Sequence, residues 1–530
     1  MIKFNVPFQE TGYFSKIVKD YLEKNERIAP FYNNYPDLEG FKRQITAKKE
    51  SFSELSREVL HTSLEQQYKD VSISEKTKKN INLLRQNCTF TVTTGHQLNL
   101  FTGPLYFLYK IITAINLSKQ LKKEFPNFDF VPVYWMATED HDFEEIQYFN
   151  FKGNKISWNR EASGAVGRLT TEGLDAVLET FSKQLGESSN EKYIKNIFKE
   201  AYLLHANLTE ATRFLANKLF GEYGLVIIDG DDKALKKQFA PIVKEELVNN
   251  TSYNNVTETI KELEINYKIQ VNPREINLFY LENSLRERII FEEGIYKINN
   301  TEITFTKEEI LEEAEANSEK FSPNVLMRPV YQELILPNIC YIGGGGELAY
   351  WFELKKYFSA IAIPFPILLL RNSVLLITEM QMRKMDKLNI SKRDLFKKQD
   401  SLINEKVATL SQITIDLSSE KAYLKKMFEE LEVLSNKTDK SFLGAVKAQE
   451  KKQLKGINNL EKRLLKAQKR KYAEIVDRIT VLQEALFPKQ SLQERQANFS
   501  EFYIAYGEKS IPLLLNTLEP LKLEFDIMVV

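Results

Sequence analysis

The clearest pattern of apolar and polar positions lies between residues 89 and 146. Residues 89–94 are β-branched or aromatic throughout, which predicts a strand. After a loop with a glycine at each end, apolar residues recur three and four positions apart and predict a helix: Leu105, Leu108, Ile112 and Ile115. Residues 130–136 form a second strand-like run. This order predicts a β-α-β unit with parallel strands and a right-handed crossover.

Polar clusters follow both predicted strands. Residues 95–97 read Gly-His-Gln, and residues 139–142 read Glu-Asp-His-Asp. The carboxyl ends of parallel strands meet at one edge of a sheet, where open α/β proteins bind their ligands. The two clusters should therefore converge on one cleft.

Three later stretches extend the predicted sheet. Residues 225–229 form a continuous apolar run, as expected for a strand buried on both faces, and follow a helix predicted over 208–220. Residues 339–342 predict a short strand that runs into four glycines, after which Glu347 should begin a helix. Such glycines either point N–H groups at an anion or form a flexible turn for helix packing. Residues 360–371 predict a last buried strand, whose two prolines suit the sheet edge.

The two long stretches between these strands predict insertions. Residues 151–207 and 233–320 mix charged helical segments with short strand candidates such as 302–306. Asn272 and Arg274 in the second insertion, with Arg286 and Arg288, could reach substrate, but a solvated face is the expectation for all four.

The C-terminal part of the chain predicts long helices. Residues 417–486 are nearly free of Gly and Pro, and apolar positions step by three and four with a slip of phase between 467 and 472. A break near 436–439 would fold the segment into an antiparallel helical hairpin. The hairpin would leave an apolar seam for a second copy, so we expect a homodimer. Its basic stretch, residues 441–475, usually means a solvated face.

Composition narrows the class of protein. Lys+Arg and Asp+Glu both number 73 among 530 residues, so no global charge favours nucleic acid. Two cysteines cannot build a disulfide framework, which favours a reducing cytoplasm. No signal pattern is present at the N-terminus, and the most apolar run, residues 361–370, is too short to span a bilayer.

Five stretches of the chain carry a family resemblance. They are TTGHQLNLFTGPLYFLYKI (93–111), VPVYWMATEDHDFEEI (131–146), FGEYGLVIIDGDD (220–232), FSPNVLMRPVYQELILPNICYIGGGGELAYWFELK (321–355) and LFPKQSLQER (486–495). In this order, over nearly the whole chain, they resemble the cysteine-adding enzyme family of bacillithiol biosynthesis. The family's first loop commonly reads Gly-Gln-Gln where this chain has Gly-His-Gln, which argues against an essential proton transfer by His96.

Pattern and resemblance together predict an α/β fold. It has a Rossmann-like parallel-sheet core with two inserted connecting subdomains and a C-terminal α-helical antiparallel coiled coil. We expect the core in residues 1–150, 208–232 and 321–375, with the insertions between them. Residues 376–490 would form the coiled-coil domain, and a tail at 491–530 would pack on the core.

The resemblance implies the reaction, in which the cysteine carboxyl group is joined to the amine of glucosaminyl malate. The cysteine ammonium would bind the carboxylates of Glu139, Asp140 and Asp142. The malate carboxylates need cations or N–H groups, which Lys110, Arg328 and the glycine run Gly343, Gly344, Gly345 and Gly346 would supply. The catalytic base would be His141, with Glu144 or His96 as the next candidates. Other expected substrate-binding residues are Gln97, Thr102, Trp135, Asn324, Glu347 and Arg495.

The cysteine carboxylate must be activated before an amine can attack it. ATP with Mg²⁺ is the natural activator, but the chain has no standard ATP motif. Two other functions stay open at this stage. The cluster at 139–142 with His96 could hold a metal ion for a hydrolase, and the basic helical segment could belong to a nucleic-acid-binding or scaffold protein.

Overall fold

A five-stranded parallel sheet lies at the centre of the body of the molecule in the computed structural model, which describes residues 2–435, 437–438 and 440–530. Its strand order is β13-β12-β2-β3-β6. The strands are β2 (Thr89–His96), β3 (Asp129–Met136), β6 (Val226–Asp229), β12 (Asn338–Gly343) and β13 (Ile367–Leu370). Adjacent strands pair in parallel throughout, which confirms the predicted sheet. Every residue of β2 is buried, as its apolar pattern requires.

The predicted β-α-β unit is present. Helix α5 (Tyr106–Glu124) connects β2 to β3 and packs against both strands. It is apolar around most of its circumference because the sheet covers one side and the C-terminal helix α23 (Ser510–Thr517) contacts it as well. Helix α9 (Leu208–Phe220), which precedes β6, has the bounds that its apolar spacing predicts.

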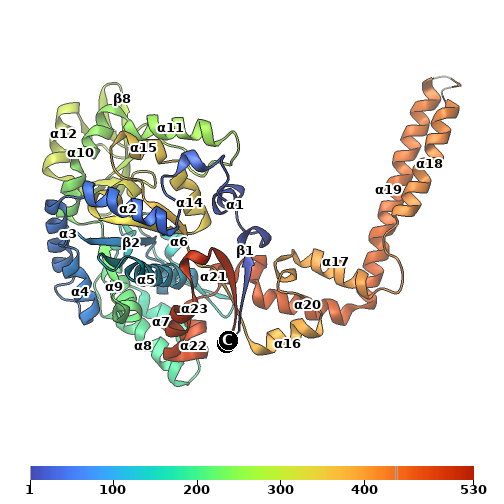
Figure 1. Ribbon diagram of the computed structural model, residues 1–530, viewed down its shortest axis with the longest axis horizontal. Coiled ribbons are helices and arrows are strands. Elements are labelled where there is room, and N and C mark those ends of the chain that lie inside the picture. Colours follow the sequence, from blue (N-terminus) through green and yellow to red (C-terminus); the bar gives the residue numbers. More distant parts are fainter. Residues whose placement is uncertain (1, 436, 439) are drawn as a thin grey trace.

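Helices and three further sheets of the described residues surround this core (Figure 1). Before β2 come α1 (Lys16–Leu22), α2 (Leu38–Ser51), α3 (Glu54–Gln67) and α4 (Glu75–Leu83). After β3 come α6 (Phe143–Ile146), the hairpin β4 (Tyr148–Phe151) and β5 (Asn154–Ser157), α7 (Leu174–Ser182) and α8 (Ser189–Leu203). After β11 (Phe321–Pro323) come α13 (Arg328–Ile335), α14 (Gly345–Phe352) and α15 (Lys355–Ala360). The tail holds α21 (Gln493–Gln496), α22 (Phe499–Tyr506) and α23.

The second insertion builds an antiparallel sheet of its own, in the order β10-β9-β8-β7-β11. It contains α10 (Lys233–Asn249), α11 (Thr251–Leu263), β7 (Leu278–Glu282), β8 (Leu285–Glu292), β9 (Ile295–Ile298), β10 (Thr304–Phe305), α12 (Lys307–Ala316) and β11 (Phe321–Pro323). Strand β11 leads directly back to the core, so this sheet lies beside the ends of the core strands.

The prediction of one long strand over residues 360–371 was wrong. Residues up to Ala360 belong to α15, and only Ile367–Leu370 pair with β12. Pro364 and Pro366 lie just before the strand. A proline has no N–H group to donate to the hydrogen bonds between strands, so this position costs the sheet no hydrogen bond. The strand does lie at the sheet edge, as predicted.

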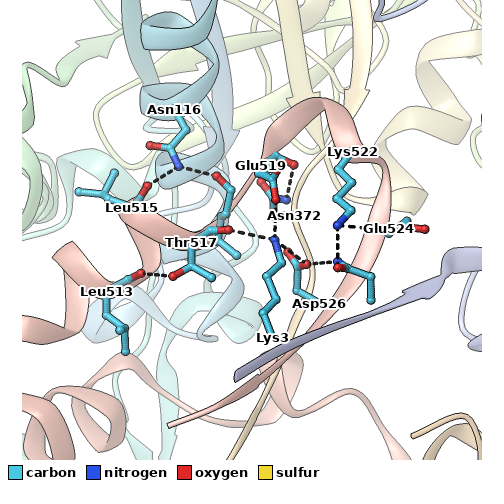
Figure 2. Close-up of polar contacts among 12 residues, drawn as sticks. Lys3, Asn116, Asn372, Leu513, Leu515, Thr517, Glu519, Lys522, Glu524 and Asp526 are labelled. Atoms are coloured by element: carbon cyan, nitrogen blue, oxygen red, sulfur yellow. Dashed lines mark hydrogen bonds and ion pairs between the residues drawn. The ribbon is translucent and has the colours of Figure 1, made fainter. Parts of the chain in front are cut away.

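The two ends of the chain meet in a third sheet, which joins β1 (Ile2–Pro7), β15 (Glu524–Val529) and β14 (Val374–Ile377). Figure 2 shows Lys3 of β1 reaching Asp526 of β15 at 3.1 Å and the Thr517 carbonyl at 2.9 Å. Asn5 donates to the same carboxylate at 2.6 Å. These partly buried contacts attach the tail to the body.

A helical arm extends away from the body (Figure 1). It consists of α16 (Glu379–Lys387), α17 (Gln399–Leu410), α18 (Ser418–Ser435), α19 (Lys440–Lys471) and α20 (Ala473–Leu486). Helices α18 and α19 lie side by side as the predicted antiparallel hairpin, and Lys421 pairs with Glu461 across it at 2.7 Å. Of the predicted break, Asn436 and Asp439 lie outside the described residues. The slip of phase predicted in the apolar positions between 467 and 472 coincides with Tyr472, which lies between α19 and α20.

Over the described part of the chain, none of the helices has the length and apolar character that a membrane span requires. The domain boundaries given above remain predictions.

Candidate active site

A cleft of about 900 Å³ opens at the carboxyl ends of β2, β3 and β12. The core supplies one side, and the sheet of the second insertion supplies the other through Phe279, Arg286 and Arg288. The two polar loops that follow β2 and β3 therefore do converge, as their place at the sheet edge predicts.

Most of the predicted site residues line this cleft. They are His96, Gln97, Lys110, Trp135, Glu139, Asp140, His141, Asn324, Arg328, Gly344, Gly346, Glu347 and Arg495. Their roles remain predictions, but the structure brings them together from five separate stretches of the sequence.

Five predicted site residues lie elsewhere. Asp142 and Glu144 line an adjoining cavity of about 790 Å³, which shares Gln97, Tyr106, Glu145 and Arg495 with the cleft. Thr102, near the end of the first loop, is buried. A Cβ on Gly343 would lie 2.8 Å from Leu348, and one on Gly345 would face Phe14 at 3.4 Å, so these two glycines serve packing.

In the glycine run, the N–H group of Gly344 is not available to an anion. Helix α14 begins at Gly345, two residues before the predicted start, because Glu347 caps it by accepting the Gly344 N–H at 2.8 Å. The same carboxylate forms an ion pair with Lys110 at 2.7 Å and accepts a hydrogen bond from the Tyr341 hydroxyl at 2.8 Å. Burial alone would raise the pKa of Glu347. The charge of Lys110 and these hydrogen bonds have a larger effect, so the pKa of Glu347 lies below its usual value. Glu347 is therefore a charged, fully engaged group.

Arginines give the cleft a cationic wall. Arg328 donates to Gln332 at 3.0 Å and to the Tyr350 hydroxyl at 3.2 Å. Arg371 lies over the Tyr106 ring and donates to the buried Glu494 at 2.7 Å. Partners on the protein side hold both guanidinium groups in place, which prepares them for a carboxylate or phosphate.

The opposite loop supplies carboxylates with different environments. Glu139 forms a buried ion pair with Lys236, whose ammonium also donates to the Phe321 carbonyl at 2.7 Å. Burial raises the pKa of Glu139, and Lys236 opposes that change. Asp140 accepts the His141 N–H at 2.7 Å and the Gln97 side-chain amide at 2.9 Å, and it is only partly buried. Asp140 is thus the more available of the two.

The aspartates at the end of β6 have structural partners. Asp229 accepts a hydrogen bond from the Thr138 hydroxyl, and Asp231 accepts hydrogen bonds from Nε and Nη2 of Arg168 at 2.8 and 2.9 Å. Asp232 caps α10 through the N–H groups of residues 234 and 235. This cluster fixes the loop beneath the cleft.

Neither cleft histidine carries a charge at neutral pH. Burial, with Lys110 nearby, lowers the pKa of His96 to about 3. His141 Nδ1 accepts a hydrogen bond from Arg286 Nη1 at 2.6 Å. Burial and, to a smaller extent, the charge of Arg286 lower the pKa of His141. His141 is half-exposed to the cleft, whereas His96 lies below the surface of its wall.

The four residues of the second insertion that were expected on a solvated face all line the cleft: Asn272, Arg274, Arg286 and Arg288. Asn272, Arg274 and Arg288 are exposed, as expected, whereas Arg286 is partly buried. No local pattern marks them, because only the folding of β7–β11 against the core brings them there. Tyr106, Tyr341 and Tyr350 were also missed, although each lies within a turn of a predicted site motif. Lys236 and Glu494 were also not predicted, because nothing in the sequence distinguishes them from other charged residues of helices.

The described residues contain no group of three or more His, Cys, Asp or Glu side chains arranged to hold a metal ion. Glu139 is paired with Lys236, and Asp140 is bound by N–H groups. The metal-dependent hydrolase alternative therefore gains no support from this cleft.

A parallel sheet with a polar cleft at its strand ends defines a Rossmann-like ligand-binding protein. The model of the bacillithiol biosynthesis BshC N-terminal Rossmann-like domain matches residues 1–372, and that of the BshC C-terminal coiled-coil domain matches residues 374–530. The chain belongs to the bacillithiol biosynthesis BshC family.

Similar proteins span the whole chain. A relative from Flavobacterium johnsoniae is 58% identical over 525 residues, covering 99% of each chain. A second, from Flavobacterium psychrophilum, is 57% identical and covers 99% of this chain and 98% of its own. A third, from Christiangramia forsetii, is 54% identical with the same coverage. All three bear the name "Putative cysteine ligase BshC".

Proposed function

We propose that the chain is a cysteine ligase of bacillithiol biosynthesis that forms an amide between the cysteine carboxyl group and the amine of glucosaminyl malate. The observation that carries the proposal is the full-length match to the BshC family, whose named relatives are cysteine ligases at 54–58% identity. The nucleic-acid-binding and scaffold alternatives have no comparable support.

The charges of the cleft suit these substrates. Asp140 offers a partly exposed carboxylate for the cysteine ammonium. Arg328 and Arg371 offer prearranged guanidinium groups for the two malate carboxylates, with Arg495 at the boundary between the two cavities. Lys110 neutralises Glu347, so this carboxylate does not repel a dianionic substrate.

The activator of the cysteine carboxylate is proposed to be ATP with Mg²⁺. A free carboxylate is a poor acyl donor, and transfer of an adenylyl or phosphoryl group to it would create a leaving group. Arg274 and Arg288 line the cleft, are exposed, and could meet phosphate oxygens.

The arm is proposed to hold two copies of the chain together. Several large apolar side chains of α18 and α19 are exposed, among them Tyr423 at 76%, Val433 at 61% and Leu460 at 59%. A second arm packed against the first would cover these side chains. The free thiols of Cys88 and Cys340 support a reducing compartment, and we propose the cytoplasm.

Product formation tests the proposed reaction. Purified protein is incubated with cysteine and glucosaminyl malate, with and without ATP and Mg²⁺, and the amide product is followed by mass spectrometry. We expect product only with nucleotide, and a loss of about 100-fold or more in Arg328→Ala. Product without nucleotide would refute the ATP step, whereas absence of product under every condition would refute the ligase.

A further inference from the structure

Arg286 reaches from β8 of the second insertion to His141 of the core. Its Nη1 donates to His141 Nδ1 at 2.6 Å. The same guanidinium donates to Ser322 Oγ and to the Pro323 carbonyl, both at 3.2 Å, and lies 4.0 Å from the centre of the Phe279 ring. These contacts fix the guanidinium, so the position of the hydrogen bond on the imidazole is fixed as well.

The hydrogen bond determines where the imidazole keeps its proton. A guanidinium has only donors, so Nδ1 must accept with its lone pair. A neutral ring that accepts at Nδ1 carries its single proton on Nε2. In a protonated ring the Nδ1–H would point at an N–H of Arg286, and the two positive charges would repel each other.

The other charged groups around the ring do not reverse this preference. Asp140 lies 3.8 Å from Nδ1, and Asp142 and Glu287 act from farther away. All three carboxylates favour the imidazolium and raise the pKa of His141, but burial and Arg286 prevail and lower it.

We propose that His141 acts on the substrate as a neutral hydrogen-bond donor through Nε2–H, and that Arg286 is the positioning residue that holds this tautomer. The inference rests on the proposed function, since the acceptor is a carbonyl or carboxylate oxygen of the ligase substrates. It replaces the expectation that His141 is the base for the sugar amine. Nδ1 is occupied by Arg286, and Nε2 already bears a proton.

Two substitutions of His141 separate a donor from a base. The amide of His141→Gln can donate from near the Nε2 position but cannot take up a proton, whereas His141→Ala can do neither. We expect kcat/KM to fall less than about 10-fold in His141→Gln and about 100-fold or more in His141→Ala. Equal loss in both variants would overturn the donor role.

Substitutions of Arg286 test its positioning role through the pH profile. In Arg286→Met nothing holds the proton on Nε2, so part of the neutral rings carry it on Nδ1 and lose the donor, whereas the imidazolium that forms at low pH regains Nε2–H. The activity of Arg286→Met relative to the wild type should therefore be lowest at high pH and recover as the pH falls. Arg286→Lys keeps a cationic donor and should restore the wild-type profile. A purely structural defect would lower activity by the same factor at every pH, and that result would overturn the positioning role.

Nitrogen NMR decides the tautomer without reference to any reaction. The chain has only four histidines, and the His141 signals are those lost in His141→Gln. With ¹⁵N-labelled histidine at pH 7, the wild type should show a protonated Nε2 and an unprotonated Nδ1, and Arg286→Met a titrating ring. An imidazolium or a protonated Nδ1 in the wild type would overturn the proposal. Lack of product with the expected tautomer would instead refute the ligase, and the donor role with it.

Discussion

The buried ion pair between Arg371 and Glu494 leads to a strong prediction about stability. Arg371 Nη2 lies 2.7 Å from Glu494 Oε1, and the two side chains are 5% and 0% exposed. Glu494 also accepts the Val374 N–H and the Ser373 hydroxyl, each at 3.2 Å. The pair joins the end of β13 in the core to α21 in the tail.

The substitution Glu494→Gln removes the charge but keeps the shape and an accepting oxygen. Arg371 is then a buried cation without a counter-charge, which should lower the free energy of unfolding by about 3–5 kcal/mol. The matched control is Glu474→Gln in the arm. Glu474 pairs with Arg478 at 2.6 Å, but the side chains are 78% and 62% exposed. Because water screens that pair, its loss should cost less than about 1 kcal/mol.

Urea unfolding followed by tryptophan fluorescence measures both variants. Trp135, Trp158 and Trp351 are all buried in the body and report its unfolding. The double variant Arg371→Met with Glu494→Gln should recover much of the loss, because no unpaired charge remains. An effect of Glu494→Gln within about 1 kcal/mol of the control would refute this reasoning.

Three further predictions concern other parts of the molecule. Burial raises the pKa of Asp526 to about 6, although Lys3 opposes the shift. The folded state therefore binds this proton more tightly than the unfolded state, and the resulting stabilisation, full below about pH 4, is lost as the pH rises through 6. Compared with Asp526→Asn, the wild type should lose about 2–3 kcal/mol between pH 4 and 7 in urea unfolding, and a difference independent of pH would contradict this. Gly343→Ala should cost about 1–3 kcal/mol because its Cβ would lie 2.8 Å from Leu348, whereas Gly346→Ala, with no atom within 4 Å, should change stability little. Light scattering should find two 61.7 kDa chains per particle in the wild type and one in Tyr423→Glu, and a dimeric variant would argue against association through the arm.

The core of the fold follows from local patterns in the sequence. Residues 89–136 alternate between strand and helix signals that need no distant information, and their prediction is confirmed. The same holds for α9 and for the hairpin of α18 and α19, which apolar spacing and a stretch nearly free of Gly and Pro predict. Residues 360–371 were misjudged because an apolar composition does not distinguish a strand from the partly exposed coil that leads into it.

The candidate site was only half predictable, for a physical reason. His141 and Arg328 lie next to strand ends and motifs, so their convergence follows from topology alone. Arg286 reaches the cleft because a separate antiparallel sheet folds over the core, and no local pattern in its own sequence signals that contact. Similarly, the pairing of Glu347 with Lys110 joins two helices, and the two residues are 237 positions apart in the sequence. Partners of this kind decide which charges remain available to a substrate.

Product analysis by mass spectrometry tests the central claim most directly. Wild-type protein, cysteine, glucosaminyl malate, ATP and Mg²⁺ should yield the amide of cysteine with the sugar amine, with its free thiol intact. Omission of nucleotide should abolish the product, and Arg328→Ala should reduce it by about 100-fold or more. If the complete mixture yields no amide while the protein is folded, the cleft does not perform this ligation, and the account is contradicted.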